Sequence, residues 1–122
     1  MEFIHKLDLR ENARLAMNYL TRMVDPDYDY LPYWLVSIHL DPPFARHCRV
    51  DDAELVASWY EAITAIRRVF DIEEGEEVQA AFKRHLLKSW GPNGLRYHED
   101  YPWTDSIHSS FHEMAYNLGA LN

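Results

Sequence analysis

The chain has little of the chemistry that marks secreted, membrane or redox proteins. Cys48 is its only cysteine, so no intramolecular disulfide can form, which favours a reducing compartment. The sequence has no apolar run of about 18 residues, the length that indicates a membrane helix. Residues 1–6 also lack the basic start and apolar stretch of a signal peptide. We therefore expect a cytoplasmic protein without a membrane span.

Glycine and positive charge are also scarce. The chain has 4 glycines, and none belongs to a phosphate-binding glycine-rich loop or to the Gly-x-Ser-x-Gly turn of serine hydrolases. It has 20 acidic and 12 basic residues, and the resulting net charge of −8 repels phosphate backbones and anionic membranes. We interpret the basic run at residues 83–85 as a solvated helix face. We expect neither nucleic acid nor membrane as a partner.

Apolar residues are plentiful and periodic. Of the 122 residues, 48% are hydrophobic and 14% aromatic, enough for one folded domain spanning residues 1–122. Apolar stripes at three-and-four spacing predict four helices, at residues 8–24, 51–70, 76–90 and 104 to the last residues. The predicted fold class is all-α, with two antiparallel helical hairpins.

Polar residues and glycines mark several ends of these helices. Asp8 with Glu11, and Asp51 with Glu54, resemble capping boxes. Residues 91–94 (Gly-Pro-Asn-Gly) cannot continue the third helix. The fourth helix carries an apolar stripe that we expect to face the core, formed by Ile107, Phe111, Met114, Leu118 and Leu121.

The connections between the helices differ greatly in length. Residues 71–75 form a short link that predicts an antiparallel hairpin. Residues 25–50 form a long segment, in which residues 35–40 suit either a short strand or a helical turn. If neighbouring helices alternate in direction, this segment and the loop before the fourth helix meet at one end of the array. Long loops of this kind are usually functional.

Both long loops combine aromatic rings with carboxylates, a composition that suits sugars. Rings stack on C–H faces, carboxylates accept hydrogen bonds from hydroxyls, and a carboxylate pair can act as acid and base. The candidate catalytic residues are Asp25, Asp27 and Glu99. The candidate substrate-binding residues are Tyr28, Trp34, His47, Tyr97, His98 and Trp103. The structural alternative is that the rings pack the loops together and the aspartates cap turns.

Five segments together resemble the start of a known family. They are residues 23–34 (MVDPDYDYLPYW), 42–48 (PPFARHC), 59–62 (WYEA), 94–98 (GLRYH) and 102–103 (PW). This order resembles the N-terminal part of six-hairpin (α/α)-toroid proteins related to glycoside hydrolases. The resemblance implies a carbohydrate-active protein with a cleft where the inner helices begin.

The same resemblance bears on assembly. Two hairpins make an arc of a toroid, so it implies either part of a larger protein or a homo-oligomer that covers the arc's flanks. The expected ligand is a saccharide or another small polar molecule, with no metal or cofactor. No family motif assigns a particular catalytic carboxylate.

Two alternatives come from other functional classes. The aromatic end of the helices could be a protein-binding patch of a non-catalytic helical module, with tyrosine and tryptophan as anchors. A metal-dependent enzyme could instead use His108, His112 and Glu113, or His98, although the glutamate that follows the first histidine in metalloprotease helices is missing.

Overall fold

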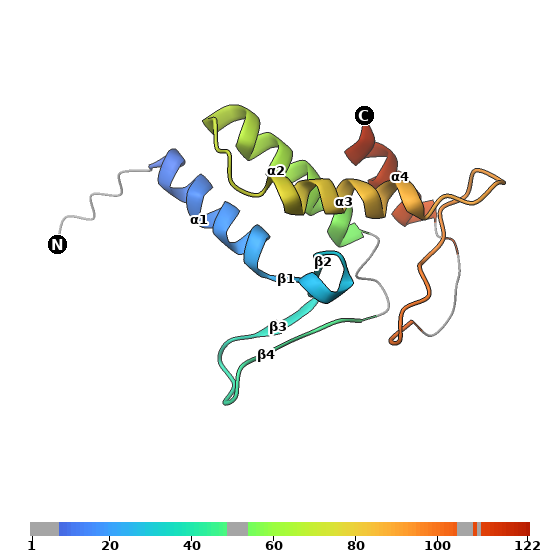
Figure 1. The fold of residues 1–122 in the computed structure, drawn as a ribbon, viewed down its shortest axis with the longest axis horizontal. Helices are drawn as coiled ribbons and strands as arrows, with labels where there is room; N and C mark the ends of the chain where they lie inside the picture. Colours follow the sequence, from blue (N-terminus) through green and yellow to red (C-terminus); the bar gives the residue numbers. More distant parts are fainter. Residues whose placement is uncertain (1–7, 49–53, 105–108, 110) are drawn as a thin grey trace.

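The computed structural model describes residues 8–48, 54–104, 109 and 111–122, and its elements are shown in Figure 1. In chain order these elements are α1 (Leu9–Arg22), β1 (Val24–Asp25), the 3-10 helix η1 (Pro26–Tyr28), β2 (Leu31–Pro32), β3 (Leu35–Ser37), β4 (Phe44–Arg46), α2 (Val56–Phe70), α3 (Glu76–Lys88) and α4 (Phe111–Leu121). Two small antiparallel sheets, β1–β2 and β3–β4, accompany the helices. The domain is therefore mixed α/β, and the all-α prediction is wrong.

Both sheets lie in the long segment after α1. Strand β1 pairs with β2 through Val24 opposite Pro32, and the chain reverses between them at Asp29 and Tyr30, whose φ angles are 51° and 60°. Strand β3 pairs with β4, so the segment whose structure was ambiguous begins as a strand. In Figure 1 the β3–β4 hairpin points away from the helices. Strands of two or three residues are too short for a periodic signal, which is why the prediction missed them.

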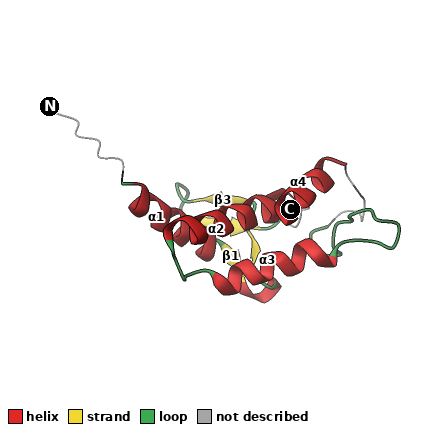
Figure 2. Cartoon of the chain, turned by 90° about the horizontal axis from the view of Figure 1, so that it is seen from above, coloured by secondary structure: helices red, strands yellow, loops and turns green. Residues whose placement is uncertain are grey.

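Helix α2 is the central element of the helical part. It packs against α1, α3 and α4, and Figure 2 shows α1, α2 and α4 following one another with α3 alongside. The buried core joins Met17 of α1, Ile63 of α2 and Phe82 of α3. The link between α2 and α3 turns through Asp71 and Gly75, both at positive φ, so the predicted antiparallel hairpin is confirmed.

The helix boundaries agree with the sequence most closely where a cap is visible. Asp8 Oδ1 accepts a hydrogen bond from the Glu11 amide at 3.0 Å, which confirms the predicted N-cap of α1. Helices α1 and α3 each end two residues before the predicted position. Asp51, the predicted start of the second helix, lies outside the described residues.

The last helix differs most from the prediction. It begins at Phe111, later than the predicted start at residue 104. Thr104 and Ser109 are not helical, and Ile107 lies outside the described residues. Two residues of its predicted core stripe are exposed, Phe111 at 84% and Leu118 at 55%, whereas Leu121 packs against the core as predicted. Its buried residues are instead Glu113 and Asn117, at 8% and 0% exposure. Helix α4 therefore turns Glu113 and Asn117 inward and Phe111 and Leu118 outward, while its end packs on the core through Leu121.

None of the helices in the described ranges combines the length and the apolar character that crossing a bilayer requires.

Candidate functional site

The two long loops meet through a column of rings, which confirms their predicted convergence. His47 stacks with Trp103 at 4.2 Å between ring centroids and 12° between planes. Tyr33 lies next to His47 at 4.6 Å, and Tyr101 stacks with Trp103 at 5.0 Å. We call these four residues the aromatic column. Tyr28 of η1 packs edge-on against Trp103 at 4.7 Å, so the column joins the segment after α1 to the loop after α3.

Asp25 anchors the first-loop end of the aromatic column. Its Oδ2 lies 3.1 Å from His47 Nε2, and its Oδ1 accepts a hydrogen bond from the Asp27 amide at 3.0 Å. Burial opposes ionisation of Asp25, but hydrogen bonds from His47, the Asp27 amide and Tyr33 outweigh it, so its pKa lies below the ordinary value. Asp25 is therefore an ionised acceptor near neutral pH.

Glu99 anchors the other end of the site. It pairs with Lys88, and its Oε1 lies 3.7 Å from His85 Nδ1. Burial raises the pKa of Glu99, but the hydrogen bonds and charges of His85 and Lys88 lower it further than burial raises it, so the net shift is downward. Glu99 is thus the second ionised carboxylate of the site.

His85 of α3 connects this carboxylate to both loops. Its Nε2 lies 3.0 Å from the Asp29 carbonyl oxygen, and its Nδ1 lies 3.4 Å from the Tyr101 hydroxyl. Because a carbonyl only accepts, Nε2 carries a hydrogen, and Nδ1 faces both the Tyr101 hydroxyl and Glu99 Oε1. The ring is 5% exposed, so α3 holds the two loops together through a buried histidine.

A cavity of about 240 Å³ opens between η1 and α3 beside the aromatic column. It is lined by Asp27, Tyr28, Asp29, Arg84, His85, Lys88 and Tyr101. Arg84 and Asp29 form a two-bonded ion pair across it, which lowers the pKa of Asp29 mainly through the Arg84 hydrogen bond. The cavity wall therefore presents paired charges of both signs and two tyrosine rings.

Six of the nine predicted site residues gather at this end of the molecule: Asp25, Asp27, Tyr28, His47, Glu99 and Trp103. The other three lie elsewhere. Tyr97 covers Gly91 and its hydroxyl accepts a hydrogen bond from Asn93. His98 is buried, with Nε2 2.9 Å from Glu113 Oε2. Trp34 is exposed before β3 and makes no ring contact with another described residue. These three residues neither line the cavity described above nor join the aromatic column.

The sequence interpretation missed the contribution of α3. Arg84, His85 and Lys88 line the cavity, whereas residues 83–85 were interpreted as a solvated face. Their spacing was the available signal, because Lys88 lies three residues after His85 and four after Arg84, and positions three and four apart share one face of a helix.

The described residues do not assemble the histidine metal site. His112 points outward, with Nε2 3.3 Å from Glu54, whereas Glu113 points inward to His98. His108 lies outside the described residues. No group of three or more metal-binding His, Cys, Asp or Glu side chains occurs in the part of the chain that the structure describes.

Comparisons of the chain with protein families, with curated proteins and with solved structures gave no match. The toroid resemblance therefore stays a prediction. The role of this site is argued from the residues of the two loops and α3 alone.

Proposed function

We propose that the cavity between η1 and α3 binds a saccharide or a similar hydroxyl-rich small molecule. The observation that supports this proposal is the balance of charge in its wall. The lining carries Asp27 and Asp29 against Arg84 and Lys88, so donors and acceptors are both present without a net formal charge of either sign. A free anion or cation would meet like charge there. A hydroxyl group both donates and accepts, so it suits such a wall.

The size of the cavity sets the scale of the ligand. Its volume of about 240 Å³ is below the roughly 300 Å³ at which pockets for drug-sized ligands begin. We therefore propose a ligand of about one sugar ring. Tyr28 and Tyr101 line the cavity and offer apolar ring surface to C–H groups. Trp103 already stacks with His47 and Tyr101, so it positions the loop instead of serving as a platform.

The carboxylates support binding better than glycosidic cleavage. A glycosidase needs one carboxylic acid with a raised pKa as the proton donor. The pKa values of Asp25 and Glu99 are both lowered, so these residues suit the acceptor, base or nucleophile role only. Asp27 is the remaining predicted carboxylate, exposed at the cavity edge. The proposal is therefore saccharide binding, with Asp27 as the residue to test for a catalytic role.

A sugar titration tests this function. We expect monosaccharides and disaccharides to change the tryptophan fluorescence of the folded protein in a saturable manner. Asp27→Asn should weaken binding about tenfold, because a hydrogen bond to a charged acceptor contributes roughly 1.5–3 kcal/mol. Asp41→Asn is the matched control, an exposed aspartate between β3 and β4 that does not line the cavity. No response across the panel, or equal effects of both variants, would refute the proposal.

A second candidate function is association of two copies through α4. The sequence of α4 carries one carboxylate, Glu113, which is buried, and no lysine or arginine. Its outward face presents Phe111, Tyr116 and Leu118. On a chain of net charge −8, this neutral apolar face lets a second copy approach without bringing acidic surfaces together. A twofold contact would then place each α4 against the other.

A further inference from the structure

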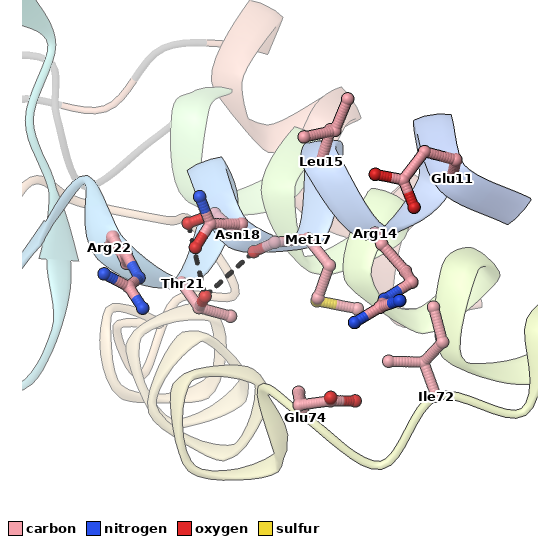
Figure 3. A pocket seen from close by; sticks show the side chains of 9 residues that line it. All are labelled: Glu11, Arg14, Leu15, Met17, Asn18, Thr21, Arg22, Ile72 and Glu74. Carbon is pink, nitrogen blue, oxygen red and sulfur yellow. Dashed lines mark hydrogen bonds between the residues drawn. The ribbon is translucent and has the colours of Figure 1, made fainter.

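A second cavity lies between α1 and the turn that joins α2 to α3 (Figure 3). Its volume is about 440 Å³, within the range of pockets that hold small molecules. It is lined by Glu11, Arg14, Leu15, Met17, Asn18, Thr21, Arg22, Ile72 and Glu74. Residues of two separate elements thus enclose one space.

Gly75 fixes the spacing of the two walls. Its φ is 84°, and an added Cβ would lie 2.9 Å from Thr21 Cγ2 and 3.1 Å from Met17 Sδ. The turn therefore approaches α1 closely at this point, where only glycine fits. Met17 and Ile72 are both buried and form an apolar surface in the cavity. The cavity has a defined wall spacing and room for an apolar group.

Opposite charges face the cavity from opposite walls. The Arg14 guanidinium comes from α1 and the Glu74 carboxylate from the turn, and both are directed at the space between these elements (Figure 3). Within the described residues, neither side chain makes a hydrogen bond or an ion pair, whereas Arg84 is held by Asp29. Arg14 and Glu74 therefore remain available to a ligand that reaches both.

The whole lining is balanced in charge, with Arg14 and Arg22 against Glu11 and Glu74. A simple anion would meet two carboxylates there, and a simple cation would meet two guanidinium groups. A zwitterion avoids both conflicts, because each of its charges can lie beside the opposite charge of the protein.

We propose that this cavity binds a free amino acid with an apolar side chain. Its carboxylate pairs with Arg14, where the planar guanidinium can donate two parallel hydrogen bonds. Its ammonium group pairs with Glu74, and its side chain packs on Met17 and Ile72. This site is independent of the proposed saccharide site, because the two cavities share no residue.

Ligands that lack one charge provide the first test. Leucine titrated into the labelled protein should give saturable NMR shifts of the amides around Thr21 and Ile72. N-acetyl-leucine lacks the ammonium charge and leucinamide lacks the carboxylate, so each should bind at least tenfold more weakly. Absence of saturable shifts at about 10 mM leucine, which is enough to detect millimolar affinity, would overturn the proposal. Equal binding of leucine and leucinamide would also overturn it.

Charge-removing variants assign the contacts. Arg14→Met should bind leucine and leucinamide equally weakly, because the partner of the carboxylate is gone. Glu74→Gln should likewise lose the preference for leucine over N-acetyl-leucine. Arg10→Met and Glu73→Gln are matched controls at neighbouring exposed positions outside the lining. Retained discrimination in the Arg14 and Glu74 variants, or equal losses in the controls, would contradict the assignment. Sugar titration of the same variants should be unchanged, which separates this site from the other.

Discussion

Replacing Glu113 by alanine should be among the most destabilising single changes in this protein. Glu113 Oε2 lies 2.9 Å from His98 Nε2 and 3.6 Å from Arg96 Nη1, and Arg96 is only 1% exposed. His98 Nδ1 lies 3.3 Å from Arg96 Nη1. Since a guanidinium only donates, Nδ1 accepts from Arg96, and Nε2 lies beside the Glu113 carboxylate. The carboxylate therefore forms an ion pair with the buried guanidinium and lies beside the histidine.

The magnitude follows from the burial of these charges. Removing one partner of a buried ion pair costs about 3–5 kcal/mol, because the other charge stays in a poorly solvated place. Domains are stable by only about 5–15 kcal/mol, so Glu113→Ala should remove a large share of the free energy of unfolding. At roughly 3–5 °C per kcal/mol for a domain of this size, the melting temperature should fall by about 10–25 °C.

Urea unfolding followed by circular dichroism measures this loss. Glu73→Ala, at an exposed position on the α2–α3 turn, is the control and should stay within about 0.5 kcal/mol of wild type. The triple change Glu113→Leu, Arg96→Met and His98→Leu removes all three polar groups and should recover most of the loss. A loss below about 1 kcal/mol for Glu113→Ala would show that this charge cluster is solvated, and the burial argument would fail.

Three further predictions concern other parts of the fold. The pKa of Asp25 is lower in the folded protein than in the unfolded chain, so ionised Asp25 stabilises the fold. This stabilisation is present above the ordinary pKa of about 4 and is lost as the pH falls through the pKa of the folded state. Asp25→Asn should therefore reduce the fall in the free energy of unfolding at acid pH. Gly75→Ala should lower the free energy of unfolding in urea by more than Gly94→Ala does. Both glycines have positive φ, but a Cβ at Gly75 would lie 2.9 Å from Thr21 Cγ2, whereas a Cβ at Gly94 meets nothing within 4 Å. Equal losses would contradict the close packing of Gly75 against α1. If two copies associate through α4, Leu118→Glu should reduce the sedimenting mass at high concentration, while Val69→Glu, at an exposed position on α2, should leave it unchanged. A monomeric wild type at every concentration would contradict this association.

The sequence predicted the parts of the fold that repeat over many residues. Helices α1, α2 and α3 each present several turns of apolar spacing, and Asp8 provides a recognisable cap for the first of them. The short α2–α3 link leaves the chain few alternatives to a hairpin. Because the direction of neighbouring helices then follows, the meeting of the two loops was also predictable.

The parts that the sequence did not predict depend on contacts between distant residues. Whether α4 buries Phe111 or Glu113 is decided by Arg96 and His98, which form the charge cluster with the glutamate but lie in the loop after α3. The position of His85 in the site likewise depends on the Asp29 carbonyl, which lies far away in sequence. Periodicity reports neighbours on one helix and carries no information about such pairs.

The aromatic column also has a consequence for the order of folding. His47 and Trp103 lie on either side of α2 and α3 in the chain, so their stacking closes a long loop. Closing this loop costs conformational entropy of the chain, which opposes formation of the contact. Helices with local contacts form early, whereas a non-local contact of this kind forms late. The near-ultraviolet circular dichroism of the stacked rings should therefore appear after the far-ultraviolet signal of the helices. The two-loop site would then be assembled last, on helices that are already in place.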